Sequence, residues 1–498
     1  MASDQHVDVL IVGAGLSGIG AACRLQMECP GKTFTILEAR EAIGGTWDLF
    51  RYPGIRSDSD MYTLGYDFRP WTEAKAIADG PSILNYIRET ARDYGVDRHI
   101  RFNHRVVRAA WSTDDAVWTV ESERSDTGET VRFTCGFLFM CSGYYRYDQG
   151  YLPEFPGVER FAGPVVHPQH WPEDLDYDGK RVVVVGSGAT AVTLVPAMAE
   201  RAAHVTMLQR SPTYVVSMPA KDPIATRLRR WLPEMRAYQA VRWKNVLLTM
   251  LSYQLSRRVP QVVRAGIRKG VEKQLGPDYD IDTHFNPRYD PWDQRMCLVP
   301  DGDLFAAISS GRASIVTDTI ETFDETGIQL TSGERLEADV VITATGLNML
   351  ALGGMQISVD GRAVELHETV AYKGMMFSGI PNLAAAMGYT NASWTLKCDL
   401  VCAYVCRLLG RMDELGVRQV TPRWPGGSLP DSPFIDLTSG YVMRSIDKFP
   451  KQGRRSPWRL YQNYIRDIVL LKRAPLDDGA VEFSNPVPAG RPAERVAV

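Results

Sequence analysis

The chain has 498 residues, of which 45% are hydrophobic and 23% charged, and its formal net charge is −3 at pH 7. Because one domain usually spans roughly 100–200 residues, this length predicts two to four domains with sizeable cores. The near balance of charges excludes a chain that is basic throughout, so we expect no nucleic-acid partner.

Cysteine use and hydropathy indicate a cytoplasmic chain. The eight cysteines include no Cys-x-x-Cys pair and form no dense framework, which favours a reducing compartment and packing thiols. The N-terminus lacks a basic leader, and no segment approaches the roughly 20 apolar residues of a membrane span. No cluster has metal-ligand spacing, so we expect no metal.

Residues 7–38 have the pattern strand, glycine-rich turn, helix, strand. The turn contains Gly13, Gly15 and Gly18 at the spacing that lets backbone N–H groups meet a pyrophosphate. Glu38 ends the second strand, where a carboxylate accepts hydrogen bonds from ribose hydroxyls. Because an acidic group would repel a 2′-phosphate, this unit suits FAD or NAD better than NADP.

Two segments rich in glycine and proline follow without a periodic pattern. The first contains Gly45, Thr46 and Trp47, and the second, residues 51–58, ends at Asp58. We predict an ordered loop that reaches the flavin ring; a simple connection is the alternative.

A second strand-turn-helix-strand unit spans residues 181–209. Its turn supplies the predicted contacts to a second dinucleotide: Gly186, Ser187, Gly188, Ala189 and Thr190. Arg210 and Ser211 stand where the first unit has its glutamate, and an arginine there can pair with a 2′-phosphate. We therefore predict NADPH at this unit. If Arg210 is only a surface residue, NADH and NADPH should be used equally.

Two buried strands at 137–143 and 339–346 each run into a glycine and predict crossings between domains. The expected fold is α/β, with two Rossmann-like dinucleotide-binding domains, for FAD and NADPH, the second inserted into the first. The predicted ranges are 1–145 and 339–498 for the two parts of the FAD-binding domain with a C-terminal segment, 146–220 and 291–338 for the two parts of the NADPH-binding domain, and 221–290 for a helical insertion.

The helical insertion is strongly basic. Residues 221–275 hold thirteen lysines or arginines and three acidic residues. An apolar side is supplied by Trp231, Trp243, Leu247, Leu248, Leu251 and Leu255. Two interpretations stay open: a helical cap over the active site with a solvated basic face, or a peripheral contact with a membrane surface or an acidic partner.

The linker between the two nucleotide units carries the most specific pattern, Phe161-x-Gly163-x-x-x-His167-x-x-x-Trp171-Pro172. It resembles, at every fixed position, the fingerprint of type I Baeyer–Villiger monooxygenases. Related flavin-containing monooxygenases typically have Tyr or Phe at the last aromatic position. The resemblance extends over nearly the whole chain and is strongest to the subgroup that includes the mycobacterial ethionamide-activating monooxygenase.

We interpret His167 as a structural or hinge residue, because the fingerprint lies in a linker. Zinc ligation by His167 and His170 is the alternative, but no companion ligands stand at suitable spacing.

The resemblance implies an NADPH-dependent flavoprotein that uses O2 to convert ketones to esters or lactones through a C4a-peroxyflavin, and that oxidises thioethers as well. This chemistry needs a fixed positive charge, which arginine supplies because it keeps its proton. By resemblance that residue is Arg295, with Asp58 as its partner. Gln294 stands where many family members have a lysine for the 2′-phosphate, which leaves Arg210 as the main support for NADPH. A surface-loop position for Arg295 is the alternative.

Three other functions are alternatives to this one. An N- or S-hydroxylating flavin-containing monooxygenase would leave ketones untouched. A pyridine nucleotide-disulfide reductase would need a Cys-x-x-Cys pair beside the flavin, which the sequence lacks. A noncatalytic flavin-binding or membrane-docking protein would not oxidise NADPH.

Overall fold

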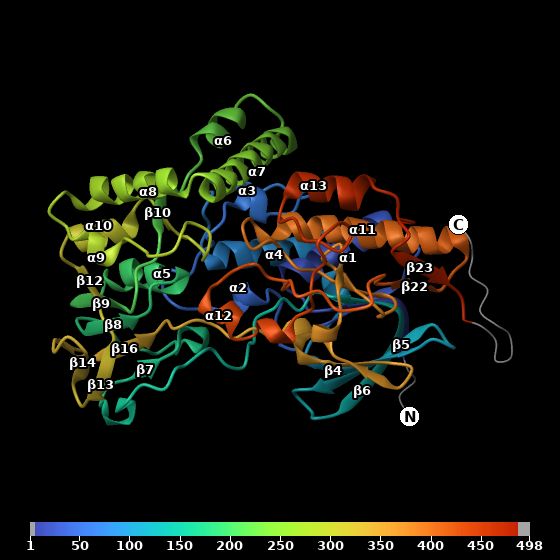
Figure 1. The fold of residues 1–498 in the computed structure, drawn as a ribbon, viewed down its shortest axis with the longest axis horizontal. Coiled ribbons are helices and arrows are strands. Elements are labelled where there is room, and N and C mark those ends of the chain that lie inside the picture. Colours follow the sequence, from blue (N-terminus) through green and yellow to red (C-terminus); the bar gives the residue numbers. More distant parts are fainter. Residues whose placement is uncertain (1–4, 487–498) are drawn as a thin grey trace.

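The computed structural model describes residues 5–486. Two sheets lie at opposite ends of the molecule, with a pair of long helices along one edge (Figure 1). The predicted ranges that begin at residue 1 and end at residue 498 therefore extend outside the described residues. Among the described residues, no helix is both long and apolar enough to cross a membrane.

The first sheet has nine strands and contains the first nucleotide-binding unit. In sheet order its strands are β18 (Arg362–Val364), β17 (Gln356–Val359), β4 (His104–Ser112), β5 (Val117–Arg124), β6 (Thr130–Met140), β1 (Gln5–Val12), β2 (Phe34–Leu37) and β3 (Ile100–Arg101), with β21 (Leu383–Ala385) beside β6. β1 pairs in parallel with β2 and β6, whereas β4, β5 and β6 form an antiparallel meander. The parallel strands are buried on both faces, which is why they read as continuous apolar runs.

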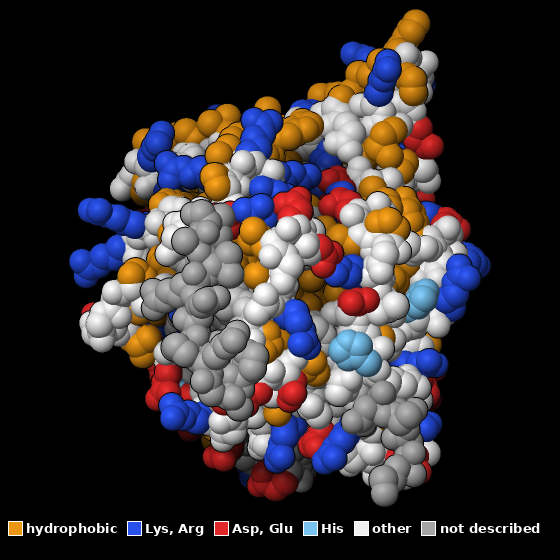
Figure 2. All heavy atoms as spheres, turned by 90° about the vertical axis from the view of Figure 1, so that its right-hand side faces the viewer, with side chains coloured by type: hydrophobic (Ala, Val, Ile, Leu, Met, Phe, Trp, Pro, Cys, Tyr) orange, Lys and Arg blue, Asp and Glu red, His pale blue; other side chains and the backbone are white. Residues whose placement is uncertain are grey.

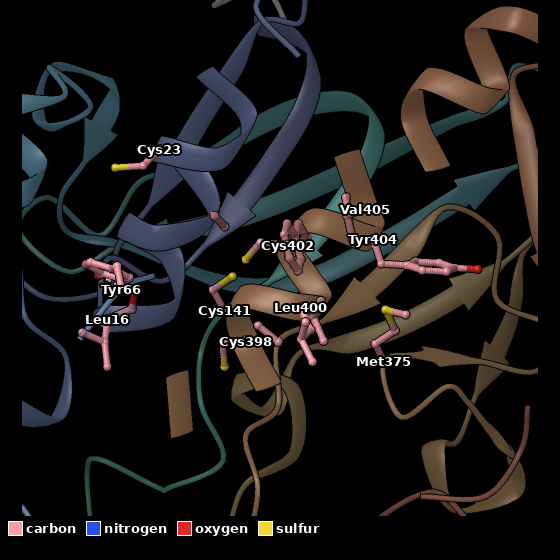
Figure 3. Packing of buried hydrophobic residues seen from close by; sticks show 14 of the residues in the cluster. Leu16, Cys23, Tyr66, Cys141, Met375, Cys398, Leu400, Cys402, Tyr404 and Val405 are labelled. Carbon is pink, nitrogen blue, oxygen red and sulfur yellow. Dashed lines mark hydrogen bonds between the residues drawn. The ribbon is translucent and has the colours of Figure 1, made fainter. Parts of the chain in front are cut away.

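Three helices cover this sheet on the side of the molecule that carries the long helices (Figure 1). They are α1 (Leu16–Glu28), α4 (Gly80–Asp93) and α11 (Trp394–Leu415). Figure 3 shows Leu16, Cys141, Cys398, Leu400 and Cys402 packed where α11 meets α1 and the segment after β6. Burial raises the pKa of the Cys398 thiol to about 12, so it packs as a neutral, largely apolar group.

The second sheet has five parallel strands. In sheet order they are β12 (Ala313–Thr317), β9 (His204–Gln209), β8 (Arg181–Val185), β16 (Val340–Thr343) and β7 (Val165–Val166). Helices α5 (Ala189–Met198) and α10 (Asp303–Ser309) pack on it, and a small antiparallel sheet of β13 (Ile320–Asp324), β14 (Gly327–Leu330) and β15 (Arg335–Glu337) adjoins it. The predicted α/β architecture with two Rossmann-like folds is confirmed.

One predicted boundary is wrong. β16 pairs with β8 and β7, so residues 340–343 belong to the second sheet and not to the completion of the first fold after 338. The cause is that a buried parallel strand has the same apolar pattern in either sheet. The chain returns to the first sheet only after Gly346, and β17 then pairs with β4. The other domain limits stay predictions.

The helical insertion consists of α6 (Pro223–Leu228), α7 (Glu234–Arg258), α8 (Pro260–Leu275) and α9 (Ile281–His284). Its base is closed by β10 (Val215–Met218), which pairs in parallel with β11 (Cys297–Pro300). The buried Arg242 of α7 donates to the carbonyl oxygens of Tyr62 at 2.8 Å and Gly65 at 2.7 Å, and it pairs with Asp399 of α11 at 3.1 Å. α7 is thereby anchored on the first fold.

The other regular elements are short: α2 (Thr46–Leu49), α3 (Met61–Leu64), β19 (Ala371–Tyr372), β20 (Met376–Phe377), β22 (Gln419–Pro422), α12 (Gly440–Met443), α13 (Tyr464–Ile468) and β23 (Val481–Ser484). β19 pairs with β20 and β22 with β23, both antiparallel. α12 lies near the cavity described below, and α13 packs on α11.

The close approach of α1 to the first turn gives a testable prediction. A Cβ atom at Gly18 would lie 1.8 Å from the carbonyl oxygen of Gly13, whereas one at Gly31 would meet nothing within 4 Å. We expect Gly18→Ala to lower the free energy of unfolding by about 1–3 kcal/mol because the helix must move away from the strand. Denaturant unfolding measures this. Gly31→Ala is the matched control, and an equal effect of the two substitutions would contradict the explanation.

Candidate active site

A cavity of about 820 Å³ lies where the two Rossmann-like folds meet, and residues of both folds line it. The predicted site residues in its wall are Gly13, Gly15, Glu38, Gly45, Thr46, Trp47, Asp58, Ala189, Thr190 and Arg295. The structure thus brings together residues from five separate predicted segments. The predicted residues outside the wall are Gly18, Gly186, Ser187, Gly188, Arg210, Ser211, Gln294 and the fingerprint residues Phe161, Gly163, His167, Trp171 and Pro172.

The first glycine-rich turn presents a helix N-terminus to the cavity. Gly13 has φ of +105° and approaches the carbonyl of Cys141, so a side chain there would collide with backbone. Gly15 is the N-cap of α1 and lines the cavity. The free N–H groups and the helix dipole together favour an anion such as a pyrophosphate.

Glu38 follows β2 directly and is buried at the cavity wall. One carboxylate oxygen accepts from the backbone N–H of Ala14 at 2.7 Å and the other from that of Arg40 at 2.9 Å. Burial is the largest influence on this group and raises the pKa of Glu38. The two backbone donors hold the carboxylate in one orientation, as recognition of a ribose requires.

Arg295 and Asp58 form an ion pair in the cavity wall, with 2.8 Å between Nη2 and Oδ2. About a third of each side chain is exposed, 32% in both cases, so the pair faces the cavity and is not enclosed in the core. Asp58 is the main cause of a pKa of Arg295 above its usual range. The Arg295 guanidinium therefore keeps its positive charge at the wall.

The loop at 51–58 connects the two folds as well as lining the cavity. Tyr52 is buried in the core of the second fold, and burial raises its pKa to about 12. Gly54, with φ of +76°, lies against α5 so closely that a Cβ would be 3.0 Å from the carbonyl oxygen of Thr193. Arg56 forms an ion pair with Asp303 at the start of α10. This loop places Asp58 beside Arg295.

The second glycine-rich turn is open to solvent. Gly186, with φ of +138°, approaches the carbonyl of Ala344, and a Cβ at Gly188, the N-cap of α5, would meet nothing within 4 Å. The Ser187 hydroxyl lies 3.2 Å from the Ser211 carbonyl oxygen, which joins the turn to the end of β9. Arg210 is exposed and makes no ion pair with any residue between 5 and 486.

The fingerprint histidine joins the two linkers between the folds. His167 Nε2 lies 3.1 Å from the Gly346 carbonyl oxygen, and Nδ1 accepts from the Gln169 backbone N–H at 3.2 Å. Nε2 must therefore carry the proton and the ring is neutral, in agreement with burial, which lowers the pKa of His167. Both ring nitrogens are engaged, which leaves neither for a metal. Among the described residues, no group of three or more His, Cys, Asp or Glu is placed to hold one.

The other fingerprint residues pack within the second fold. Phe161 packs edge-on against Phe323, with 6.2 Å between the ring centroids. Gly163 lies so close to the chain that a Cβ there would be 2.4 Å from the Asp339 carbonyl oxygen. Trp171 packs on the core of this fold, and the Pro172 carbonyl accepts from Leu175. Gln294 lies beside Arg295 but outside the cavity wall.

Sequence reasoning missed the aromatic residues around Arg295. Tyr144, Tyr145 and Trp394 line the cavity, with ring centroids 4.5 Å apart for the two tyrosines and 5.1 Å apart for Tyr144 and Trp394. Tyr147 contacts Thr46 at 3.0 Å between the two hydroxyl oxygens. Tyr144, Tyr145 and Tyr147 directly follow the predicted domain crossing at Gly143, and this run of tyrosines could have indicated them as site residues. Trp394 stands at the start of α11.

The helical insertion does not line this cavity; among the described residues, its wall includes none between 223 and 275. Both interpretations of the insertion, a cap over the active site and a peripheral contact, therefore stay predictions. The inner face of α7 instead lines a much smaller space together with Tyr389 and Ala392, two residues that also line the main cavity.

Comparison with known proteins identifies the family. The model of the flavin-binding monooxygenase-like family matches residues 6–377. The chain belongs to this family. The predicted flavoprotein monooxygenase class is thereby confirmed.

Two relatives match over nearly their whole length. The FAD-containing monooxygenase EthA of Mycobacterium tuberculosis H37Rv is 58% identical over 98% of this chain and 99% of that protein. The putative FAD-containing monooxygenase MymA of the same strain is 53% identical over 97% of this chain and 98% of that protein. These identities agree with the resemblance inferred from the fingerprint.

A solved structure of oxidized steroid monooxygenase bound to NADP superposes with a TM-score of 0.74 at 22% identity, covering 97% of this chain and 100% of that one. A cyclohexanone monooxygenase from Rhodococcus sp. Phi1 bound to NADP+ gives 0.70 at 21% identity, over 85% and 87% of the two chains. These likenesses establish the fold of this family member.

The His167 contacts predict a pH effect on stability. Because the folded ring has a lowered pKa, the unfolded chain binds the proton more tightly, so stability should fall as the pH decreases through about 6.5, the ordinary histidine value. His167→Ala should lower the free energy of unfolding at pH 7.5 by about 1–3 kcal/mol, since two hydrogen bonds are lost, and should weaken this pH dependence. Denaturant unfolding at pH 5.5 and 7.5 measures both effects.

The exposed His170, two residues beyond Pro168 in the same segment, provides the matched control variant His170→Ala. Burial also lowers the pKa of His99 and His284, so some pH dependence should remain in every variant. An unchanged pH dependence in His167→Ala, equal to that of the control, would argue against the neutral-ring assignment.

Proposed function

We propose that this chain is a Baeyer–Villiger monooxygenase that uses FAD, NADPH and O2 to insert one oxygen atom into ketones, giving esters or lactones, and that it also oxidises thioethers. The single observation that carries the proposal is the Arg295–Asp58 ion pair in the wall of the cavity between the two folds. Membership of the flavin-binding monooxygenase-like family and the similarity to FAD-containing relatives support the cofactor assignment.

The residues present fit FAD at the first fold. Gly13 and Gly15 leave room for a pyrophosphate at the N-terminus of α1, and Glu38 is held where a ribose would lie. Thr46 and Trp47 extend the same wall toward Asp58. Reduced flavin, when bound, supplies the activation of O2 for transfer of one oxygen atom.

NADPH fits the second fold through the open turn at Ser187 and Gly188 and through the exposed Arg210. An arginine that makes no ion pair with the described residues is available to a 2′-phosphate, which it can bind through two parallel hydrogen bonds. Thr190, in the first turn of α5, lines the cavity and marks where a nicotinamide would enter it. The family's usual lysine before the catalytic arginine is absent at Gln294, so Arg210 carries the discrimination.

Arg295 acts as a fixed cation. When oxygen adds to a ketone carbon, negative charge develops on the carbonyl oxygen, and a guanidinium already in place stabilises it without reorganisation. Asp58 is a positioning residue that holds the guanidinium and keeps it protonated. The aromatic side chains of Tyr144, Tyr145 and Trp394 reduce the water around the pair, which strengthens its field.

A turnover assay tests this proposal. The FAD-loaded protein should consume NADPH faster when an aliphatic or aryl ketone is added, with ester detected by gas chromatography. Arg295→Ala should still oxidise NADPH but lose ester formation by about a hundredfold or more, the effect of removing one transition-state donor. Arg423→Ala, at an exposed ion pair remote from the cavity, is the control.

Three outcomes would contradict the proposal. Unchanged ester formation in Arg295→Ala would remove the role given to this residue. Sulfoxide or hydroxylamine without ester across a broad ketone panel would indicate an N- or S-hydroxylating enzyme. Absence of NADPH oxidation under all conditions would indicate a noncatalytic protein.

Arg210 gives a separate prediction about cofactor choice. Arg210→Ala should raise the KM for NADPH by roughly tenfold to a hundredfold, because a charge-assisted contact contributes about 1.5–3 kcal/mol, and should leave the KM for NADH almost unchanged. Steady-state kinetics with both cofactors measures the difference. Arg201→Ala, beyond the far end of α5, is the matched control. Equal shifts for NADH and NADPH would place the 2′-phosphate contact at another residue.

A further inference from the structure

The outward face of α7 is apolar, which is unusual for a surface helix. Leu247, Leu251 and Leu255 follow one another at intervals of four residues and lie on one face. Their exposed fractions are 52%, 56% and 44%. No charged residue occurs between 245 and 256. The opposite face of the helix, with Tyr238 and Val246, is buried on the first fold, so packing within this chain does not account for the outer leucines.

The apolar face continues beyond α7 onto the neighbouring segments of the insertion. Trp231, between α6 and α7, is 81% exposed. Its other exposed members are Ile224, Leu232, Met235, Trp243, Leu248, Val259 and Val262. The α6–α7 part of the insertion rises above the rest of the molecule (Figure 1), and Figure 2 shows orange side chains interspersed with blue ones on this projection. Where it projects from the molecule, this surface is a ridge and not a groove.

Basic side chains border the ridge. Some arginines and lysines of the insertion make internal ion pairs: Arg242, Lys244, Arg257, Arg264 and Arg268. Others are exposed and make no ion pair with the residues that the structure describes: Arg227, Arg230, Arg236, Arg258, Lys269 and Lys273. The latter group provides positive charge around the apolar ridge while the whole chain carries −3.

We propose that this ridge, residues 224–262, docks on an anionic lipid surface. Apolar side chains on a convex helix enter the boundary between headgroups and acyl chains, and a tryptophan is well suited to that depth. The flanking arginines and lysines meet the lipid phosphates. This peripheral contact is separate from the cavity chemistry.

Two other occupants agree less well with the surface. In a two-fold dimer the same surface would face itself, which would bring two clusters of positive charge together. An acidic partner protein would satisfy the arginines but would need a complementary concavity for a convex row of leucines, which the charge alone does not provide. A lipid surface adapts to the ridge and satisfies both the apolar and the basic side chains.

Vesicle co-sedimentation of the FAD-loaded full chain tests the proposal. Wild type should sediment with vesicles of equal parts phosphatidylglycerol and phosphatidylcholine, and less with phosphatidylcholine alone. The bound fraction should fall when salt is raised from about 0.1 M to about 0.5 M, because exposed charges are then screened. The triple variant L247S/L251S/L255S should bind about tenfold more weakly, since the inserted side chains become polar.

Matched variants separate the contribution of the apolar side chains from that of the basic side chains. L152S/L429S changes two leucines that are exposed elsewhere, at 55% and 44%, and should bind like wild type. R227Q/R230Q/R236Q should weaken binding to the anionic vesicles only. NADPH oxidation in vesicle-free buffer should be unchanged in all variants, which shows that each one is folded and keeps this result independent of the ketone assay.

Either of two results would overturn the proposal. One is that wild type does not sediment with the anionic vesicles, and the other is that wild type and L247S/L251S/L255S sediment equally. A wild-type oligomer in vesicle-free buffer that this variant converts to a smaller species, seen by light scattering without vesicle binding, would identify a second copy as the occupant of the ridge.

Discussion

The ion pair between Asp58 and Arg295 is the contact on which the site depends, because each partner is supplied by a different part of the chain. Asp58 ends a loop that leaves the first fold, and Arg295 lies two residues before β11 at the base of the helical insertion. Removing either residue would leave the other as an uncompensated charge in a partly enclosed wall. The arrangement therefore exists only while the loop at 51–58 stays docked on the second fold.

Several contacts keep the loop and the linkers in that position. Gly54 lets the backbone lie against α5, and Arg56 pairs with Asp303 on α10. On the other side, His167 links the segment that enters the second fold to Gly346, where the chain leaves it. The backbone N–H of Tyr151 donates to the same carbonyl oxygen, so the neutral histidine is one of several contacts that fix the relative placement of the folds. A fingerprint outside the cavity can in this way control geometry inside it.

Local patterns explain which parts could be predicted from the sequence. Gly13, Gly15 and Glu38 belong to one strand-turn-helix-strand unit, so their spacing alone places them together. The partnership of Arg295 with Asp58 came from family resemblance, since no local rule joins such distant segments. β16 was assigned to the wrong sheet because buried strands look alike in either sheet. Trp394 is brought to the cavity wall by the packing of α11 on the first fold.

In the insertion, the periodic pattern of apolar residues does not predict which side of the helix is buried. An apolar side on a basic helix predicts burial of that side, yet α7 is apolar on both sides and only the inner one is buried. Arg242 accounts for the orientation. Its guanidinium binds three backbone carbonyls and Asp399, and a buried charge held in this way cannot turn outward without losing them all. The leucines at 247, 251 and 255 are thereby kept on the solvent side. The buried ion pair thus holds an apolar face in contact with solvent, where it has no partner among the described residues. This is the physical reason to seek its partner outside the chain.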